Sequence, residues 1–234
     1  MSNQFHHHPD AHSAVEDCAR HILSRLDGKP KATLAISGGA SPTVMFEIFA
    51  KTAFPWERVQ LFWVDERGVP PDDAQSNFKL ANDHWLAPGR FPQANIHRIQ
   101  AELPAQIAAE RYVAEIRQVF GTAAGVLPEF DVIHQGMGPD GHTASLFPGE
   151  PLIRDRTGVA AAVRVEKFKQ WRITLLPGVL LTAKSTAMLV TGADKSAALK
   201  AVLEGPEDPE KYPSQIIARE GRDVTWFLAT NGPE

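Results

Sequence analysis

The chain has 234 residues, of which 43% are hydrophobic and 22% charged, and its formal net charge is -4. This balance is ordinary for a soluble globular protein and creates no global positive field that would attract nucleic acid or anionic membrane. The single cysteine, Cys18, excludes an internal disulfide and a cysteine-based metal cluster. We find neither a signal peptide nor an apolar run of about 18 residues, and we therefore expect a cytoplasmic protein.

The first segment is rich in histidine. His6-His7-His8 could bind a metal ion, but their place beside the terminus favours a disordered tail over residues 1–10. Apolar residues then recur at helical spacing from Ala11 to Leu26, and Asp27-Gly28-Lys29-Pro30 ends this predicted helix.

The next segment reads as a strand, a turn and a helix. Ala32–Ile36 is apolar and runs straight into Ser37-Gly38-Gly39, after which Ser41 is suited to cap a helix that starts near Pro42. Free backbone N–H groups and the positive end of the helix dipole meet at such a turn, so we expect an anion site. An ordinary connection without a ligand is the alternative. Because no Gly-Lys-Ser/Thr follows, this is not a Walker loop.

The following segments alternate between strands and helices. Charged residues Asp65-Glu66-Arg67 follow the apolar strand Val59–Val64, where α/β sheets place ligand contacts, although a solvated ion-pair cluster is the alternative. The alternation predicts one α/β domain over residues 1–234, with three layers, a mostly parallel sheet and helices on both faces, a Rossmann-like arrangement. The other expected helices are Ser76–Trp85, Pro104–Phe120, Pro177–Ala183 and one ending near Leu203; the other expected strands are Ile96–Ile99, Phe130–Gln135, Val159–Val165, Trp171–Leu176, Ser185–Thr191 and Val224–Ala229.

The segment Gly136–Gly149 is central to the sequence. It follows a buried strand, must turn sharply at its glycines and prolines, and holds Asp140 and His142 two residues apart, which suits acid–base chemistry. Its glycine spacing also matches a dinucleotide fingerprint, but Pro148 and Pro151 leave too little room for the helix that this fingerprint needs. A purely structural turn, in which Asp140 caps a short helix, stays open at this point.

Further charged groups stand near other strand ends. Lys195 lies in the first turn of a predicted helix, where it opposes the helix dipole, and a bound anion would explain this position. If the strands are parallel, their carboxyl ends share one edge, and Lys195, Arg172 and Arg67 could converge with the glycine turns. This inventory indicates acid–base chemistry on a small phosphorylated substrate. Ser145 lacks a Gly-x-Ser-x-Gly elbow that would support it as a nucleophile.

Taken together, these motifs resemble the 6-phosphogluconolactonase family, within the glucosamine/galactosamine-6-phosphate isomerases and 6-phosphogluconolactonases. The resemblance implies a metal-independent carboxylic ester hydrolase without cofactors. Such an enzyme converts 6-phosphoglucono-δ-lactone to 6-phosphogluconate in the oxidative pentose phosphate pathway, as a monomer or homodimer. The motifs that carry it are Ser37-Gly-Gly-Ala-Ser-Pro42, Val64-Asp-Glu-Arg-Gly-Val-Pro70, Ser76-Asn77, Gly136-Met-Gly-Pro-Asp-Gly-His-Thr-Ala-Ser-Leu-Phe-Pro-Gly149, Arg172-Ile-Thr174 and Gly192-Ala-Asp-Lys195.

From this resemblance and the turn chemistry we expect two sets of site residues. His142 matches the general base of the family, Asp140 would orient it or the attacking water, and Arg67 would stabilise charge on the lactone. Asp65 and Glu66 could hold the Arg67 guanidinium in position. Binding of the substrate and its phosphate is assigned to Ser37, Gly38, Gly39, Asp65, Arg172 and Lys195.

The sequence departs from the family pattern in two places. His134-Gln135 stands where the family usually has apolar residues, and we expect altered packing beneath the site. Lys167-Phe-Lys-Gln-Trp171 replaces a proline-rich run, which leaves open whether Lys167 or Lys169 reaches the substrate.

Two other functions were weighed. Glucosamine-6-phosphate deaminase shares several motifs, but its Phe-Asn-Glu-Pro carboxylate is missing from Leu146-Phe147-Pro148, which favours lactone hydrolysis. A non-catalytic sugar-phosphate sensor would carry a helix-turn-helix, and the segment before the first strand leaves no room for one.

Overall fold

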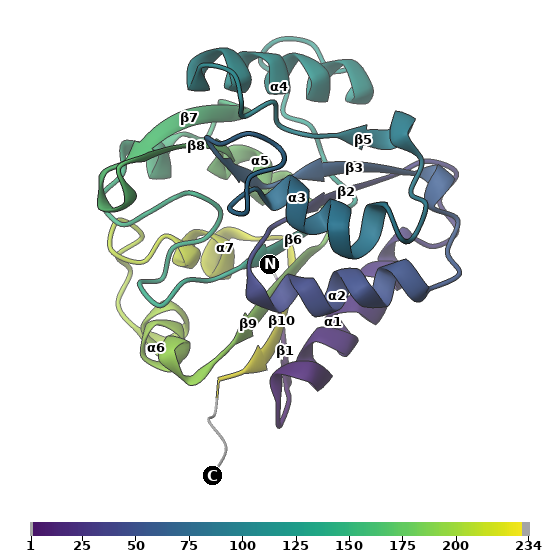
Figure 1. Cartoon of the computed structure of the whole chain (residues 1–234). Helices are drawn as coiled ribbons and strands as arrows, with labels where there is room; N and C mark the ends of the chain where they lie inside the picture. Colours follow the sequence, from purple (N-terminus) through teal and green to yellow (C-terminus); the bar gives the residue numbers. More distant parts are fainter. Residues whose placement is uncertain (1, 231–234) are drawn as a thin grey trace.

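The computed structural model describes residues 2–230 and contains a seven-stranded sheet and a smaller three-stranded sheet (Figure 1). The strand order of the large sheet is β1-β10-β9-β6-β2-β3-β5, and every neighbouring pair is parallel. Its strands are β1 Ser2–His7, β2 Ala32–Ile36, β3 Val59–Trp63, β5 Ile96–His97, β6 Val132–Gly136, β9 Thr186–Thr191 and β10 Asp223–Ala229. The α/β fold with a mainly parallel sheet is therefore confirmed, whereas the extent of the domain over residues 1–234 stays a prediction.

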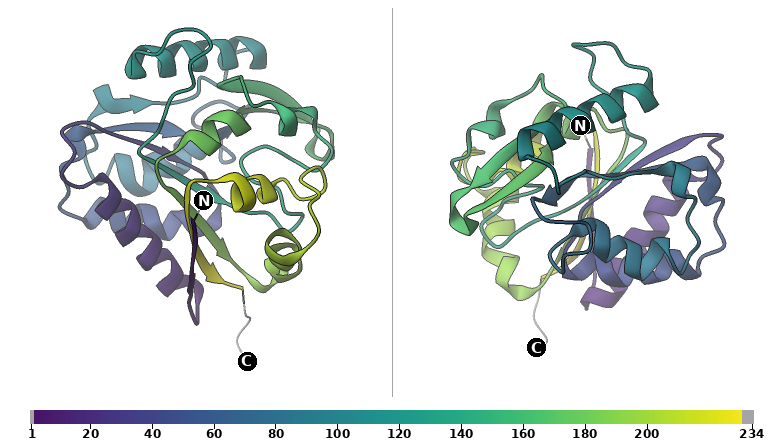
Figure 2. Two further views of the ribbon diagram at one scale, coloured as in Figure 1. Left: turned by 180° about the vertical axis from the view of Figure 1, so that it is seen from behind. Right: turned by 45° about the horizontal axis from the view of Figure 1, so that its top comes forward.

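Helices cover both faces of the large sheet, as the two views of Figure 2 show. Helix α1 packs against α2 and against strands β9 and β10, while α7 packs against α5 and α6. Every residue of β2 and β9 is buried, as expected for parallel strands covered on both faces. The helices are α1 Ala11–Leu26, α2 Ala40–Lys51, α3 Asn77–Ala81, α4 Ala105–Phe120, α5 Pro177–Thr182, α6 Ser196–Glu204 and α7 Ser214–Glu220.

The small sheet differs from the expected arrangement. β4 (Asp65–Arg67), β8 (Gln170–Leu175) and β7 (Ala160–Val165) form an antiparallel sheet in the order β4-β8-β7. The two later strands were predicted, but they do not join the parallel sheet. Because β4 continues directly from the end of β3, it carries the small sheet to the edge where the parallel strands end.

The expectation of a disordered tail over residues 1–10 is wrong for the residues that the structure describes there. β1 pairs along its whole length with β10, and Phe5 stacks on Trp226 with ring centroids 6.4 Å apart. Asp10 then caps α1 by accepting a 2.8 Å hydrogen bond from the Ser13 backbone N–H. The partner that orders this segment lies at the other end of the chain, so local sequence could not reveal it.

Two helical details also differ from expectation. The helix predicted over residues 76–85 divides into α3, capped by Ser76, and a π-helical turn at Asn82–Leu86. Helix α7 was not predicted and follows the loop that ends at Pro213. No helix within residues 2–230 has the length and apolar character needed to cross a membrane.

Candidate active site

A pocket of about 320 Å³ opens where strands of the parallel sheet end, next to the small sheet. Its walls come from segments that follow β2, β3, β6 and β9, and from β4 and β8. The carboxyl ends of parallel strands are the usual place for a ligand in such a fold. The predicted site residues that line this pocket are Ser37, Gly38, Gly39, Asp65, Arg67, His142, Arg172 and Lys195.

Asp140 joins the pocket through His142. Its Oδ1 lies 2.5 Å from His142 Nδ1, and its Oδ2 accepts a 3.0 Å hydrogen bond from Lys167 Nζ. The hydrogen bond from His142 holds the pKa of Asp140 well below its usual range, so the carboxylate stays charged. A charged carboxylate only accepts hydrogen bonds, which assigns the proton to Nδ1 and leaves Nε2 of neutral His142 free to take one.

The imidazole of His142 is closely packed by two neighbours in the same turn. A Cβ atom at residue 138 would collide with its ring, so only glycine fits there. Phe147 also stacks on the ring, with centroids 4.2 Å apart and an interplanar angle of 28°. Asp140 caps no helix, because the next helical residues begin only at Pro151. The tight turn therefore positions the imidazole, and the reading of Asp140 as a helix cap is wrong.

The Ser37-Gly38-Gly39 turn leads into α2 without a side-chain cap. Gly39 is the N-cap residue, with a φ of 122° that favours glycine, and no side chain bonds the first helical N–H groups. The expected cap, Ser41, instead has its Oγ 2.6 Å from the Thr191 Oγ1 on β9. A Cβ at residue 38 would collide with the Asn77 side chain. The backbone at this turn is thus close-packed, and the expected anion site there stays a prediction.

The carboxylates before Arg67 do not hold its guanidinium, contrary to expectation. Asp65 Oδ2 accepts a 2.6 Å hydrogen bond from Ser145 Oγ, which fastens the Gly136–Gly149 turn to β4. Arg67 itself donates from a terminal guanidinium nitrogen to the Gln75 carbonyl, at 2.5 Å.

Glu66 stabilises the start of α3 instead. It accepts hydrogen bonds from the backbone N–H groups of Asn77 and Phe78, at 2.7 and 2.8 Å, and from the Ser76 hydroxyl at 3.0 Å. Burial raises the pKa of Glu66, although these hydrogen bonds oppose the shift. With Asp65 7% and Glu66 2% exposed, the alternative of a solvated ion-pair cluster is also wrong.

Three cations line the pocket. Arg67 on β4 and Arg172 on β8 are directly opposite each other in the antiparallel register, and Lys195 precedes α6. Burial lowers the pKa of both Arg172 and Lys195. Within residues 2–230 none of the three forms an ion pair with a carboxylate. Like charges that face each other across strands are destabilising, so an anion in the pocket would stabilise this arrangement.

Sequence reasoning missed several residues at this pocket. Phe168 lines it, lies under the Arg172 guanidinium at 5.4 Å from the ring centroid, and contacts Phe147, which in turn stacks on His142. His134 also lines it; Nδ1 accepts a 3.4 Å hydrogen bond from the Ser37 N–H, and burial lowers its pKa to about 4. The only advance signal for His134 was that it departs from an apolar pattern.

The two lysines of the β7–β8 link make different contacts, and whether either reaches the substrate stays open. Lys167 forms an ion pair with Asp140, whereas Lys169 lies at the tight turn between the strands with a φ of 50°. Neither residue is among those that line the pocket.

This fold and pocket define an α/β protein that combines an imidazole–carboxylate pair with a cationic wall at the ends of its strands. The chain belongs to the family described as glucosamine-6-phosphate isomerases/6-phosphogluconolactonase, which matches residues 9–226. The resemblance found in the motifs is thereby confirmed.

Individual relatives cover nearly the whole chain. The chain is 37% identical to a 6-phosphogluconolactonase of Synechocystis, over 88% of this chain and 85% of that protein. It is 34% identical to the rat 6-phosphogluconolactonase, over 92% and 85% of the two chains. Among solved structures, the 6-phosphogluconolactonase of Thermotoga maritima superimposes with a TM-score of 0.83 at 28% identity, covering 97% of this chain and 100% of the other. A monomeric glucosamine-6-phosphate deaminase shares the fold, with a TM-score of 0.80 at 17% identity, covering 95% of each chain.

Proposed function

We propose that this protein hydrolyses 6-phosphoglucono-δ-lactone to 6-phosphogluconate, the lactone-opening step of the pentose phosphate pathway. The observation that carries the proposal is that His142, which is paired with Asp140, lines the same pocket as three cations that form no ion pair with a carboxylate within residues 2–230. A general base beside a cationic wall suits a substrate with a reactive carbonyl and an anionic group. The relatives that carry this enzyme's name support the choice of lactone.

In the proposed reaction His142 Nε2 removes a proton from water while the water oxygen attacks the lactone carbonyl carbon. The carbonyl oxygen becomes an oxyanion, and collapse of the tetrahedral intermediate breaks the bond between that carbon and the ring oxygen. The imidazolium then returns the proton to the leaving ring oxygen, which becomes a hydroxyl group. Asp140 remains charged throughout; it orients the ring and stabilises the imidazolium.

The three cations have two different roles in this proposal. Arg67 stabilises the oxyanion, and its hydrogen bond to the Gln75 carbonyl holds the guanidinium in place. Arg172 and Lys195 bind the phosphate together with Ser37, Gly38 and Gly39, where the start of α2 adds N–H groups and the helix dipole. Asp65 supports the substrate site through its bond to Ser145.

The lactone reading competes with a deaminase-like isomerase. In this chain the residues after the Asp-Gly-His motif supply an aromatic ring, Phe147, against His142 and no carboxylate for ring opening. The shared fold with a deaminase does not distinguish the two activities.

A coupled assay tests the proposal directly. Freshly prepared 6-phosphoglucono-δ-lactone is mixed with the purified chain, and 6-phosphogluconate formation is compared with spontaneous hydrolysis, with and without a chelator. We expect acceleration in both conditions. A parallel sample with glucosamine 6-phosphate should release no ammonia; ammonia release without lactone hydrolysis would replace the proposal with the isomerase.

A further inference from the structure

The ordered N-terminal strand brings two histidines to one face. Side chains alternate along an extended strand, so His6 and His8 point the same way while His7 between them is exposed on the other side. The extended pairing continues past β1, because the His8 backbone N–H donates a 2.8 Å hydrogen bond to the Leu228 carbonyl on β10. Both histidines are thus held by the sheet.

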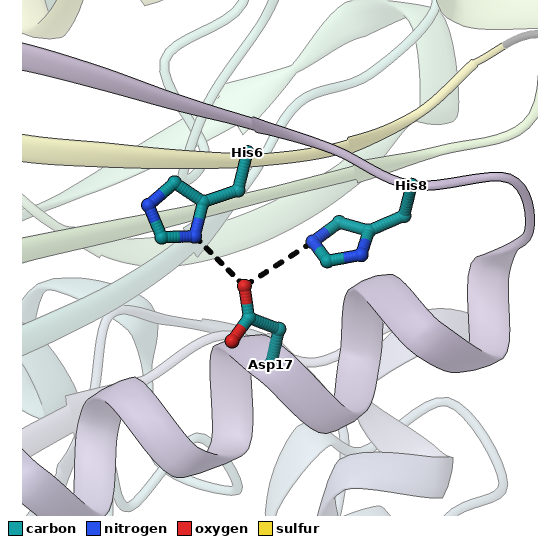
Figure 3. A group of neighbouring side chains, drawn as sticks. All are labelled: His6, His8 and Asp17. Carbon is teal, nitrogen blue, oxygen red and sulfur yellow. Dashed lines mark hydrogen bonds and ion pairs between the residues drawn. The ribbon is translucent and has the colours of Figure 1, made fainter.

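Helix α1 supplies a carboxylate beneath them. Asp17 Oδ2 lies 2.7 Å from His6 Nδ1 and 3.3 Å from His8 Nε2, as Figure 3 shows. The three ligand atoms all lie within 4.8 Å of one another. In the described structure His8 Nε2 makes no well-formed hydrogen bond although the atom is buried. Its position beside the carboxylate is therefore not explained by hydrogen bonding alone.

The donor set suits a divalent transition-metal ion. Ligands about 2.0–2.2 Å from a zinc ion lie roughly 3–3.5 Å from one another. The two distances to Asp17 Oδ2 are near this spacing, and the two imidazole nitrogens lie within 4.8 Å of each other. Two imidazoles and one carboxylate favour zinc-like ions over magnesium or calcium, which prefer all-oxygen sites.

The neighbours of these ligands already orient them. The His6 ring packs edge-on against Phe227, with centroids 5.2 Å apart. Arg20 donates to Asp17 Oδ1 at 3.3 Å, which leaves Oδ2 for an ion. Such supporting contacts are typical of metal ligands.

We infer that His6, His8 and Asp17 bind one Zn²⁺-class ion, with a fourth position left to water. The ion would fasten the edge strand β1 onto α1. Because none of the three residues lines the pocket, the site would add stability rather than take part in catalysis. The competing account is that Asp17 simply accepts hydrogen bonds from the two rings.

Zinc titration followed by calorimetry separates these accounts. The tag-free full chain is stripped with chelator, dialysed, and titrated with ZnCl₂ in phosphate-free buffer at neutral pH. We expect saturable binding of one ion, weakened about tenfold or more in His8→Ala and in Asp17→Asn. His7→Ala is the matched control and should bind as the parent does. No saturable binding in the parent, or equal weakening by His7→Ala, would overturn the inference.

Two further readouts locate the ion and guard against loss of fold. Excess Zn²⁺ should raise the melting temperature of the parent and of His7→Ala but not that of Asp17→Asn, while MgCl₂ should raise none of them. Circular dichroism confirms that Asp17→Asn is folded before it is compared. In zinc-soaked crystals an anomalous peak belongs between the three side chains; a peak elsewhere, for instance beside His12 and Glu16, would refute the site.

Discussion

His142 and Arg172 line the same pocket, but only His142 has a carboxylate partner among the described residues. The imidazole has a carboxylate on Nδ1, a stacked aromatic ring and a close-packed glycine. Arg172 is 9% exposed, is paired with Arg67 in the β4–β8 register and has its guanidinium over Phe168, and it forms no ion pair with a carboxylate among residues 2–230. His142, which we call the paired side of the pocket, has a carboxylate partner within the protein, whereas the cations, which we call the unpaired side, have none within residues 2–230.

This difference indicates two separate roles, lowering the reaction barrier and binding the anionic substrate. A base that is already oriented needs no reorganisation when the reaction occurs, which is how preorganised groups lower a barrier. A buried cation without a partner costs stability until an anion arrives. The paired side is therefore expected to control turnover, and the unpaired side to control substrate binding, except where a cation contacts the reacting carbonyl.

The largest effect should come from the paired side. We expect His142→Ala to lower kcat by ~10²–10⁴ with little change in KM, because the variant still holds the phosphate but lacks the base. Initial rates in the coupled assay measure both constants, and an unchanged melting temperature shows that the variant is folded. A kcat within about threefold of the parent would remove His142 from the base role.

Arg67→Ala should show whether one of the cations contributes to turnover, as His142 does, rather than to substrate binding. If Arg67 stabilises the oxyanion, kcat should fall by about 10²–10³ while KM changes little. The alternative is that Arg67 binds the phosphate together with Arg172, its neighbour in the β4–β8 register. A folded variant with full kcat and a raised KM would move Arg67 to the phosphate and end the oxyanion assignment.

Arg172→Ala should affect binding most. A charge-assisted contact to phosphate is made before and during the reaction, so we expect KM to rise about tenfold or more with kcat nearly constant. Lys167→Ala is a useful comparison, because that lysine bonds Asp140 outside the pocket and should leave KM close to the parent value. An unaltered KM in Arg172→Ala would argue against a phosphate contact.

The sequence predicted the parallel sheet and most of its helices because apolar periodicity and glycine turns are local signals. It also named part of the pocket lining, since strand ends such as Ser37-Gly38-Gly39 and the turn that carries His142 have recognisable chemistry. The conformation of His142 itself depends on Phe147 and Gly138, which stand a few residues away in the same motif.

What the sequence could not predict depends on distant partners. β1 is ordered by β10, and the small sheet forms because β4 finds β8, more than a hundred residues later. The hydrogen bonds of Glu66 likewise come from residues about ten positions later, the backbone N–H groups of Asn77 and Phe78 at the start of α3. His134 was visible only as a departure from an apolar pattern, and the structure makes it a buried histidine on the pocket wall.

The last prediction concerns stability rather than catalysis, and it tests whether the buried His134 is one of the groups that lack a partner in the folded protein. Burial lowers its pKa to about 4, below the ordinary value of 6.5, and its Nε2 has no hydrogen-bond partner among the described residues. Between these two values the unfolded chain binds more protons than the folded one, so stability is full above about pH 6.5 and is lost as the pH falls toward 4. From pH 6.5 to 4.5 the loss from this group amounts to about 2 kcal/mol.

Urea unfolding of the parent and of His134→Leu across that pH range measures the effect. The leucine variant should lose less unfolding free energy on acidification, by about 2 kcal/mol, because it has no proton to bind there. Asp140 does not confuse the comparison, since its lowered pKa places its own loss of stability below the ordinary carboxyl value of 3.8. His21, whose pKa burial also lowers, is present in both proteins and cancels. The exposed His12 on α1 provides the control, and His12→Leu should follow the parent. If His134→Leu also follows the parent, the buried imidazole is protonated or hydrated in the folded protein, and it no longer counts among the unpaired groups of the pocket.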